Sequence, residues 1–286
     1  SVELPESIRT IGDWAFNNND LTEIILSDNV ISIGSNAFDG NYFTTFHIPK
    51  NLQEIGRQNF SNYHNITSYT IDPENPYFTI VDGIVYTSDM KELVQAPKNY
   101  YNKDFHVPEG VEIIRQTAFR GSWLDTITLP DSLVSIESFV FTENNITEIS
   151  FGPNVKDLND WMFVHNPIEV FTVDENNPYF IFFEGALYSF DMTKLYYFPD
   201  NYDQTSYVLP ATVTQIASSA FYDSNLTDLT IPGGLTVLEP YSLARAEFTT
   251  ITLPSTLITI KKSALQDNDL TSILIPEGVT HIDVEA

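Results

Sequence analysis

Apolar residues recur along this chain at a spacing that suits short strands better than a long helix. In the stretch LTEIILSDNVISIGSNAFDGNY, the first apolar cluster is Leu21, Ile24 and Leu26. A second apolar segment follows at Val30 and Ile33. Apolar side chains at such short spacing are typical of strands that bury one face. No amphipathic run is long enough for a large helix, so the pattern predicts mostly strand.

The same pattern returns through most of the chain. Units of 22 residues begin at Leu21, Leu124, Ile146, Leu226 and Phe248, and a unit of 23 residues begins at Phe43. A fixed period between about 20 and 50 residues is the signature of a solenoid. Each unit buries its apolar side chains only against the units above and below it. The repeat therefore predicts stacked rungs that coil into an elongated, right-handed solenoid.

Two longer units interrupt the series. Residues 66–123 and 168–225 form one 58-residue block that occurs twice, 102 positions apart and without a gap. Both copies contain Asn-Pro-Tyr-Phe, beginning at Asn75 and Asn177, and both close on an Ala-Phe pair. This repetition is typical of a stack of rungs and not of an enzyme built around one cleft. The functional question is therefore what the surface of the stack binds.

Proline, Ala-Phe pairs and asparagine mark fixed places in each rung. Proline follows the first strand in most units, as at Pro49 and Pro130, and ends it because proline donates no ladder hydrogen bond. The Ala-Phe pair, as at Ala37-Phe38, is expected in a short helical turn with the ring filling the core. The Asn/Asp-rich stretch that follows suits a turn, because these residues tolerate left-handed backbone.

With these slots in place, the chain resembles the leucine-rich repeat superfamily, specifically the BspA-like class of bacterial and protist surface proteins. The pattern of that class is roughly L-x-x-I-x-I-P-x-x-V-x-x-I-G-x-x-A-F-x-x-N. It is matched almost letter for letter from Leu21 to Asn41, apart from Ser27 in the proline slot. The long units, with Asn-Pro-Tyr-Phe and Gly-x-x-Tyr, resemble a variant unit of the same class.

The resemblance extends over essentially the whole chain. It departs near the C-terminal end, where Ser242-Leu243 and Ala264-Leu265 replace Ala-Phe. The resemblance implies a secreted or surface-displayed protein, because members of the class are typically exported. It also implies adhesion, since several members bind matrix proteins or other cells. The fold prediction stands on the repeat alone, whereas the adhesion prediction depends on the family.

The composition restricts the classes of partner that this chain can bind. The 286 residues include 39 acidic and 13 basic side chains, giving a formal net charge of −26. This balance argues against nucleic acid and anionic membranes, which need a surplus of Lys and Arg. An acidic surface can simply keep a rod soluble, or it can recruit a basic partner or calcium. The absence of cysteine excludes disulfides and thiolate metal sites, and no apolar run reaches the ~18 residues of a membrane-spanning helix.

The ends of the sequence lie inside repeats. Residue 1 falls within a partial unit, and Thr280–Ala286 stops where a Phe is due. We therefore expect one solenoid domain over residues 1–286, truncated at both ends and belonging to a longer protein.

Residues suited to chemistry are sparse. His47 and His106 occupy the same slot of the rung, but at least two rungs and so about 10 Å apart, too far to share a metal ion. No phosphate loop, HExxH, GxSxG or EF-hand spacing occurs. Asp39-Gly40-Asn41 and Asp223–Asn225 could hold calcium or cap turns. The sequence predicts no catalytic residues, no cofactor and no metal site.

The outward positions of the first strand form one candidate binding surface. Between the apolar slots this strand presents small polar and acidic residues, rung after rung, and the candidates are Glu23, Thr45, Thr126, Glu148 and Asp228. A solvated sheet face explains these residues equally well, because Thr pairs with Thr across a ladder. The face also lacks the aromatic and Arg anchors that usually dominate interfaces.

The second long unit offers another candidate surface. It carries aromatic residues where the first copy has none, and we take Phe182, Phe190 and Tyr196 as candidate binding residues. Strand alternation sends some of these rings inward, whereas the others should form an exposed patch near a hairpin. Such a patch suits sugar stacking or a protein anchor. Enlarged local packing, or contact with a neighbouring domain, is the alternative.

The sequence thus favours a non-enzymatic recognition module, extracellular or on a cell surface, that adheres to host or neighbouring-cell proteins. Glycan binding through residues 179–198, or a structural spacer in a larger surface protein, are the alternatives. No nucleic acid and no direct membrane insertion of this segment are expected.

Overall fold

The computed structural model describes residues 1–60, 66–98, 100 and 102–286 as a solenoid of short strands in two parallel ladders. The strands of the first ladder are β1 (Val2–Glu3), β3 (Ile24–Ile25), β5 (Thr45–Ile48), β7 (Ser68–Ile71), β11 (Asp104–His106), β13 (Thr126–Thr128), β15 (Glu148–Phe151), β17 (Val170–Val173), β21 (Ser206–Val208), β23 (Asp228–Thr230) and β25 (Thr250–Thr252). The strands of the second ladder are β2 (Thr10–Ile11), β4 (Ser32–Ile33), β6 (Glu54–Ile55), β12 (Ile113–Ile114), β14 (Ser135–Ile136), β16 (Asp157–Leu158), β22 (Gln215–Ile216), β24 (Val237–Leu238), β26 (Thr259–Ile260) and β27 (His281–Ile282).

The register of the first ladder confirms the predicted rungs. Asp104 of β11 pairs with Thr126 of β13, 22 residues further on, in parallel orientation. Within β13, Ile127 is buried whereas Thr126 and Thr128 are exposed. The alternation of a strand therefore puts the predicted apolar slots inside the solenoid and the threonines outside.

The second ladder is built from strands of two residues. Ile114 of β12, Ile136 of β14 and Leu158 of β16 follow one another in register and are buried. The turn before most of these strands is closed by a hydrogen bond to a proline carbonyl, as from Leu133 N to Pro130 O at 3.1 Å, whereas before β4 the acceptor is Ser27 O. Proline thus ends the first strand and starts the return turn, as predicted.

The Ala-Phe pairs do not form the expected short helical turns, and no helix occurs in the described residues. They lie in turns whose preceding residue has left-handed backbone, with φ of 55° at Asn36, 62° at Thr117 and 56° at Ser219. A single left-handed residue interrupts a right-handed helix. The predicted role of the ring is confirmed, because Phe38 and Phe119 are buried in the core.

Buried asparagines link successive rungs. The Asn144 amide Nδ2 donates to Phe119 O at 2.9 Å and Phe141 O at 2.8 Å, which belong to neighbouring rungs. Its Oδ1 accepts from Leu124 N at 2.9 Å. Asn41 and Asn166 make the equivalent bonds in their own rungs. Turn carbonyls that would otherwise be buried without partners are satisfied in this way.

Each long unit inserts a three-stranded antiparallel sheet into the stack. The first insert contains β8 (Phe78–Val81), β9 (Ile84–Thr87) and β10 (Glu92–Gln95), and the second contains β18 (Phe180–Phe183), β19 (Ala186–Ser189) and β20 (Lys194–Tyr197). The last strand of each insert joins the second ladder, where β10 pairs with β12 and β20 with β22 in parallel.

Both faces of each insert are buried. Val85 and Val94 pack into the core that precedes the first insert, whereas Ile84, Tyr86 and Leu93 pack into the core that follows it. An insert is therefore a layer between two cores, which explains its nearly continuous apolar strands.

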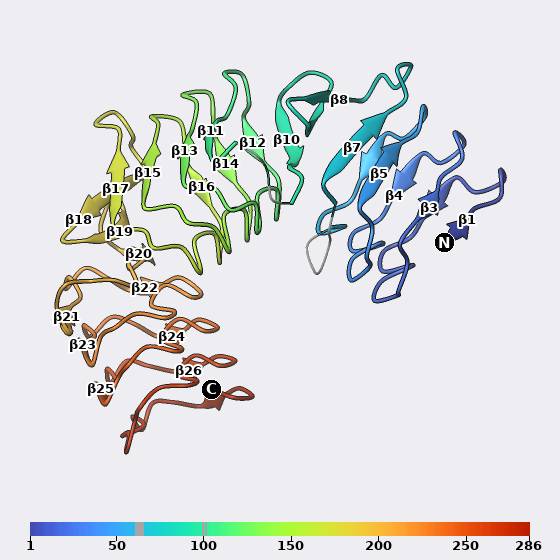
Figure 1. The fold of residues 1–286 in the computed structure, drawn as a ribbon. Coiled ribbons are helices and arrows are strands. Elements are labelled where there is room, and N and C mark those ends of the chain that lie inside the picture. The colour runs from blue at the N-terminus through green and yellow to red at the C-terminus, as the bar shows by residue number, and fades with distance from the viewer. Residues whose placement is uncertain (61–65, 99, 101) are drawn as a thin grey trace.

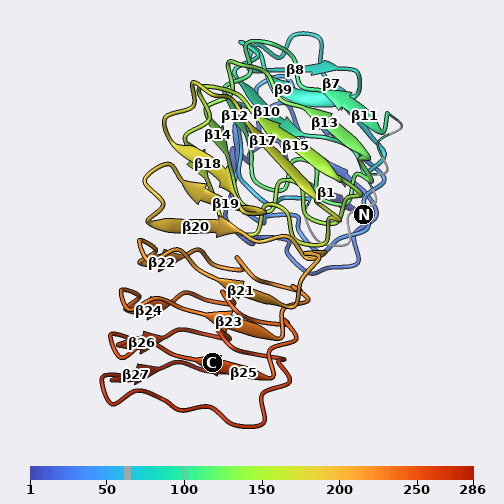
Figure 2. The same cartoon turned by 90° about the vertical axis from the view of Figure 1, so that its left-hand side faces the viewer.

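The inserts divide the solenoid into three panels, which we define as residues 1–71, 102–173 and 204–286. Figure 1 shows panel 1 at one end of an arch, panel 2 across its top and panel 3 at the other end, with an insert at each junction. Figure 2 shows panel 3 extending away from the other two. We call the junctions around β8–β10 and β18–β20 the first and second bend.

Candidate binding surfaces

The predicted outward residues of the first ladder are all exposed. Thr45, Thr126, Glu148 and Asp228 lie on β5, β13, β15 and β23, and Glu23 directly precedes β3. The inserts separate the residues of different panels, so the structure does not assemble these five into one patch. Glu23 and Thr45 lie on consecutive rungs of panel 1, Thr126 and Glu148 on consecutive rungs of panel 2, and Asp228 on panel 3.

Panel 2 has the most regular array of charge. Asp104 and Glu148 lie in one column of the ladder, and Asp125 and Glu169 lie in the neighbouring column on the alternate rungs. All four carboxylates are exposed. At ~4.8 Å per rung, carboxylates of one column are about 10 Å apart. The face is thus a checkerboard of negative charges held at fixed spacing by the sheet.

The predicted aromatic patch is only partly exposed. Phe190 is 58% exposed, whereas Phe182 and Tyr196 are half-buried. The Phe182 ring packs on Phe171 with centroids 5.9 Å apart, and Tyr196 meets Phe180 edge-on at 5.1 Å. Enlarged packing between panel 2 and the insert therefore accounts for two of the three candidates, and the structure does not bring all three into one exposed patch.

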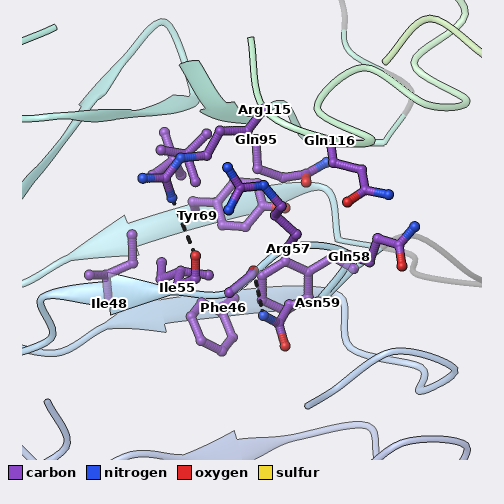
Figure 3. A pocket seen from close by; sticks show the side chains of 14 residues that line it. Phe46, Ile48, Ile55, Arg57, Gln58, Asn59, Tyr69, Gln95, Arg115 and Gln116 are labelled. Carbon is purple, nitrogen blue, oxygen red and sulfur yellow. Dashed lines mark hydrogen bonds between the residues drawn. The ribbon is translucent and has the colours of Figure 1, made fainter. Parts of the chain in front are cut away.

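The first bend is closed by arginines. Arg57, after β6, forms a two-pronged ion pair with Glu137, which lies 80 residues away and after β14. Arg115 pairs with Glu92, and its Nη1 donates to Ile55 O at 3.3 Å across the bend (Figure 3). Burial raises the pKa of Glu137, but hydrogen bonds from Arg57 and from Gln116 N outweigh it and hold the pKa below its ordinary value.

A small cavity remains among these side chains. Figure 3 shows Arg57, Gln95 and Arg115 gathered around Tyr69, and the cavity that they line holds about 20 Å³. That volume is enough for about one water molecule. The Tyr69 hydroxyl is buried with no partner among the described residues, and burial raises the pKa of Tyr69. The first bend is therefore packed too tightly to admit a larger ligand.

The second bend has the same backbone plan but smaller side chains. At the offset of 102 residues, Asn159 stands where Arg57 does, Ala217 where Arg115 does and Ser218 where Gln116 does. A groove of about 400 Å³ lies here. Its lining comes from the residues after β16 and from β20, β22, β24 and their flanks, and consists of Asp160, Lys194, Thr214, Gln215, Ile216, Ala217, Ser218, Thr236, Val237 and Glu239. We call it the second-bend groove.

Aromatic side chains brace the second bend beside this groove. The Trp161 ring stacks on Phe139 at 5.9 Å and meets Tyr222 and Tyr241 edge-on at 5.0 and 4.9 Å. Trp161 precedes the second insert and the two tyrosines follow it, so these contacts span the bend. No local pattern in the sequence indicates this cluster, because its members, from Phe139 to Tyr241, are up to 102 residues apart.

Charged groups complete the brace. Asp223 accepts from Arg245 Nε at 2.8 Å and lies 3.3 Å from His165 Nε2 across the bend. Nearby, burial and the Asp223 charge raise the pKa of Asp200 to about 8. Its nearest hydrogen-bond partner is the Tyr197 hydroxyl, at 3.5 Å.

The remaining features suited to chemistry have structural roles or stand apart. The side chain of Asn41 is engaged in the rung-to-rung bonds, and that of Asp223 in ion pairs. Among the described residues, no group of three or more His, Asp or Glu side chains could hold a metal ion. The same part of the chain contains no helix long and apolar enough to cross a bilayer.

The repeat identifies the family. The BspA type leucine rich repeat region matches residues 1–100, 98–198 and 191–286, in six copies. The chain therefore belongs to the BspA-type leucine-rich repeat family, as its sequence pattern indicated. Leucine-rich repeat proteins generally act as non-enzymatic modules that bind other proteins. The comparison with curated proteins gave no match.

Solved structures share the fold at low sequence identity. A leucine-rich repeat protein from Eubacterium ventriosum is 17% identical, with a TM-score of 0.59, over 97% of this chain and 67% of that one. The pneumococcal vaccine antigen PcpA is 22% identical, with a TM-score of 0.50, over 98% of this chain and 57% of that one. A leucine-rich cell surface protein from Faecalibacterium prausnitzii is 16% identical, with a TM-score of 0.49, over 99% of this chain and 87% of that one.

Proposed function

We propose that this protein is a non-enzymatic recognition module on a cell surface or outside the cell, and that it adheres to proteins of a host or neighbouring cell. The description of PcpA as a vaccine antigen supports such a location. The adhesive face is the first ladder of panel 2. Its partner carries basic side chains.

The checkerboard of carboxylates on panel 2 carries this proposal. Asp104, Asp125, Glu148 and Glu169 are exposed on consecutive rungs. Because the ladder fixes the spacing of these groups, the module loses little conformational entropy when it binds a partner. Many weak charge contacts then add up, although the face has no aromatic or Arg anchor.

Adhesion through this face depends on salt. Exposed charge pairs contribute about 0.2–1 kcal/mol each and are screened at high ionic strength. Complementary charge also raises the association rate more than it lowers the dissociation rate. We expect modest affinity that falls as salt is added.

The test is binding of the labelled module to an array of matrix proteins, cell-surface proteins and glycans, with and without calcium. The variant Asp125→Asn/Glu148→Gln/Glu169→Gln should lose the protein signal. A matched variant, Asp20→Asn/Asp269→Asn/Glu277→Gln, removes the same charge from exposed positions off panel 2 and should keep it. Equal loss in both variants, binding to glycans only, or no binding at all would refute the proposal.

A further inference from the structure

We infer that the second-bend groove is a receptor site for an arginine side chain of a partner protein. This inference rests on the proposed function, because it assumes that the module recognises proteins. It adds a second contact, which lies on the second ladder. The adhesive carboxylates Asp104, Asp125, Glu148 and Glu169 lie on the first ladder.

The first bend shows what this backbone plan holds. There, the guanidinium of Arg57 spans from one panel to the next and binds both carboxylate oxygens of Glu137. Arg115 lies beside it, bound to Glu92 and to a backbone carbonyl across the bend. The chain thus fills its own first bend with two guanidinium groups.

The second bend keeps the acceptor and lacks both arginines. Glu239 stands at the place of Glu137, while Asn159 and Ala217 replace Arg57 and Arg115. The counterpart of the first-bend cavity, lined here by Asn159 and Tyr197, holds only about 10 Å³, whereas the groove beside it, lined by Ala217 and Ser218, holds about 400 Å³. A volume of this size falls within the range of ligand sites.

Two carboxylates of the groove, Asp160 and Glu239, keep oxygens that no donor of the described residues occupies. The Asp160 carboxylate has no hydrogen-bond or ion-pair partner among the described residues. Lys261 binds only Oε2 of Glu239, at 2.6 Å, which leaves Oε1 for a ligand. Lys194 also lines the groove, but its ammonium lies over the Tyr196 ring, 4.3 Å from the centroid. A cationic donor therefore finds carboxylate oxygens without partners.

A guanidinium suits this lining better than a lysine ammonium or a polyol. It presents five N–H donors in a planar fork and is more weakly hydrated than an ammonium, so it costs less to bring into a groove. The floor of the groove is formed by Ile216, Ala217 and Val237. Its apolar atoms can cover the methylene stem of the arginine.

The test uses Nα-acetyl-arginine N-methylamide and its citrulline analogue, which has the same shape without the charge. Binding to the whole protein is followed by amide chemical shifts in NMR titration. We expect the arginine probe to bind at least about tenfold more tightly than the citrulline probe, the difference made by hydrogen bonds to charged groups. The shifts should cluster at β20, β22 and β24.

Two variants test the groove from opposite directions. Asp160→Asn/Glu239→Gln removes the negative charge of the groove and should lower the affinity for the arginine probe about tenfold or more. Ala217→Arg fills it with the side chain that the first bend already accommodates, and should abolish binding. The control Asp20→Asn/Glu277→Gln removes equal charge from exposed positions outside the groove and panel 2, and should leave the affinity within twofold. Thermal unfolding of every variant checks the fold.

Equal affinity for arginine and citrulline, or no loss in Asp160→Asn/Glu239→Gln, would overturn the inference. So would a neutral oligosaccharide that competes for the groove and is displaced by Ala217→Arg. Failure here is distinct from failure of the proposed function. A protein ligand that still binds the Ala217→Arg variant at full strength would leave panel 2 as the adhesive face and refute the groove alone.

Discussion

The buried asparagine at the end of a rung should be among the strongest single contributors to stability. Asn144 is 4% exposed and bonds three backbone groups, Phe119 O, Phe141 O and Leu124 N, at 2.8–2.9 Å. The substitution Asn144→Ala removes these three hydrogen bonds and leaves Leu124 N without a partner, whereas Phe119 O still accepts from Ser122 N and Phe141 O from Asn166 Nδ2. No side chain of alanine can replace the amide, and the site lies between rungs, away from bulk water.

The expected loss in the free energy of unfolding follows from these three hydrogen bonds. An unsatisfied buried donor or acceptor costs about 1–3 kcal/mol, and water that enters the new space recovers a part. Taking about 1 kcal/mol for the unpaired Leu124 N and about 1 kcal/mol for each of the two lost hydrogen bonds to carbonyls, we expect Asn144→Ala to lower the free energy of unfolding by about 3 kcal/mol. Such a loss is large for a single substitution.

The assay is equilibrium unfolding in urea, followed by circular dichroism and by the fluorescence of Trp161 and Trp123. The matched control is Asn145→Ala. Asn145 is the exposed neighbour, and its side chain makes one bond, to Asp125 Oδ1 at 3.3 Å. It should change the free energy of unfolding by less than about 0.5 kcal/mol. A loss below about 1 kcal/mol for Asn144→Ala, or an equal loss in both variants, would show that the rung-to-rung bonds are not what holds the turns.

Two further predictions concern the second insert. Asn177 donates to Gly152 O and Val155 O and accepts from the first amides of β18, so Asn177→Ala should cost about 2–4 kcal/mol. Hydrogen exchange should then rise in β18 and β19 before it rises in panel 1, and uniform exchange would contradict this. Folding raises the pKa of Asp200 from 3.8 to about 8, so its contribution to stability is full below pH 4, declines as the pH rises and is lost above pH 8. Asp200→Asn should therefore be more stable than the parent at pH 9 and lose part of the decline between pH 4 and 8 in thermal unfolding, and an unchanged pH profile would contradict this.

The rungs themselves could be predicted because every rung repeats the same short-range pattern of buried and exposed positions. Ile114, Ile127 and Ile136 are buried where the spacing placed them, since alternation along a strand decides which side chains face inward. Proline likewise ended the first strand without help from distant residues. The predicted helical turns were wrong because the left-handed residue before each Ala-Phe pair has no consistent identity, being Trp14, Asn36, Thr117 or Ser219.

The inserts show where local pattern stops being informative. Alternation correctly separated Phe182 from Phe183, which is exposed. It could not show that the inward face of Phe182 meets Phe171 of panel 2, because both faces of the insert are covered by different panels. Two of the three candidate aromatic residues, Phe182 and Tyr196, therefore pack against other rings, and only Phe190 is largely exposed.

The sequence by itself determined the family, the ladder, the buried slots and the outward array of acidic residues, because these depend on neighbours one rung away at a fixed offset. Only the tertiary structure decided what meets across the bends. Arg57 and Glu137 are 80 residues apart, and their pairing depends on how an inserted sheet turns one panel against the next. The second-bend groove also depends on this junction, because it is lined by residues as far apart in sequence as Asp160 and Glu239.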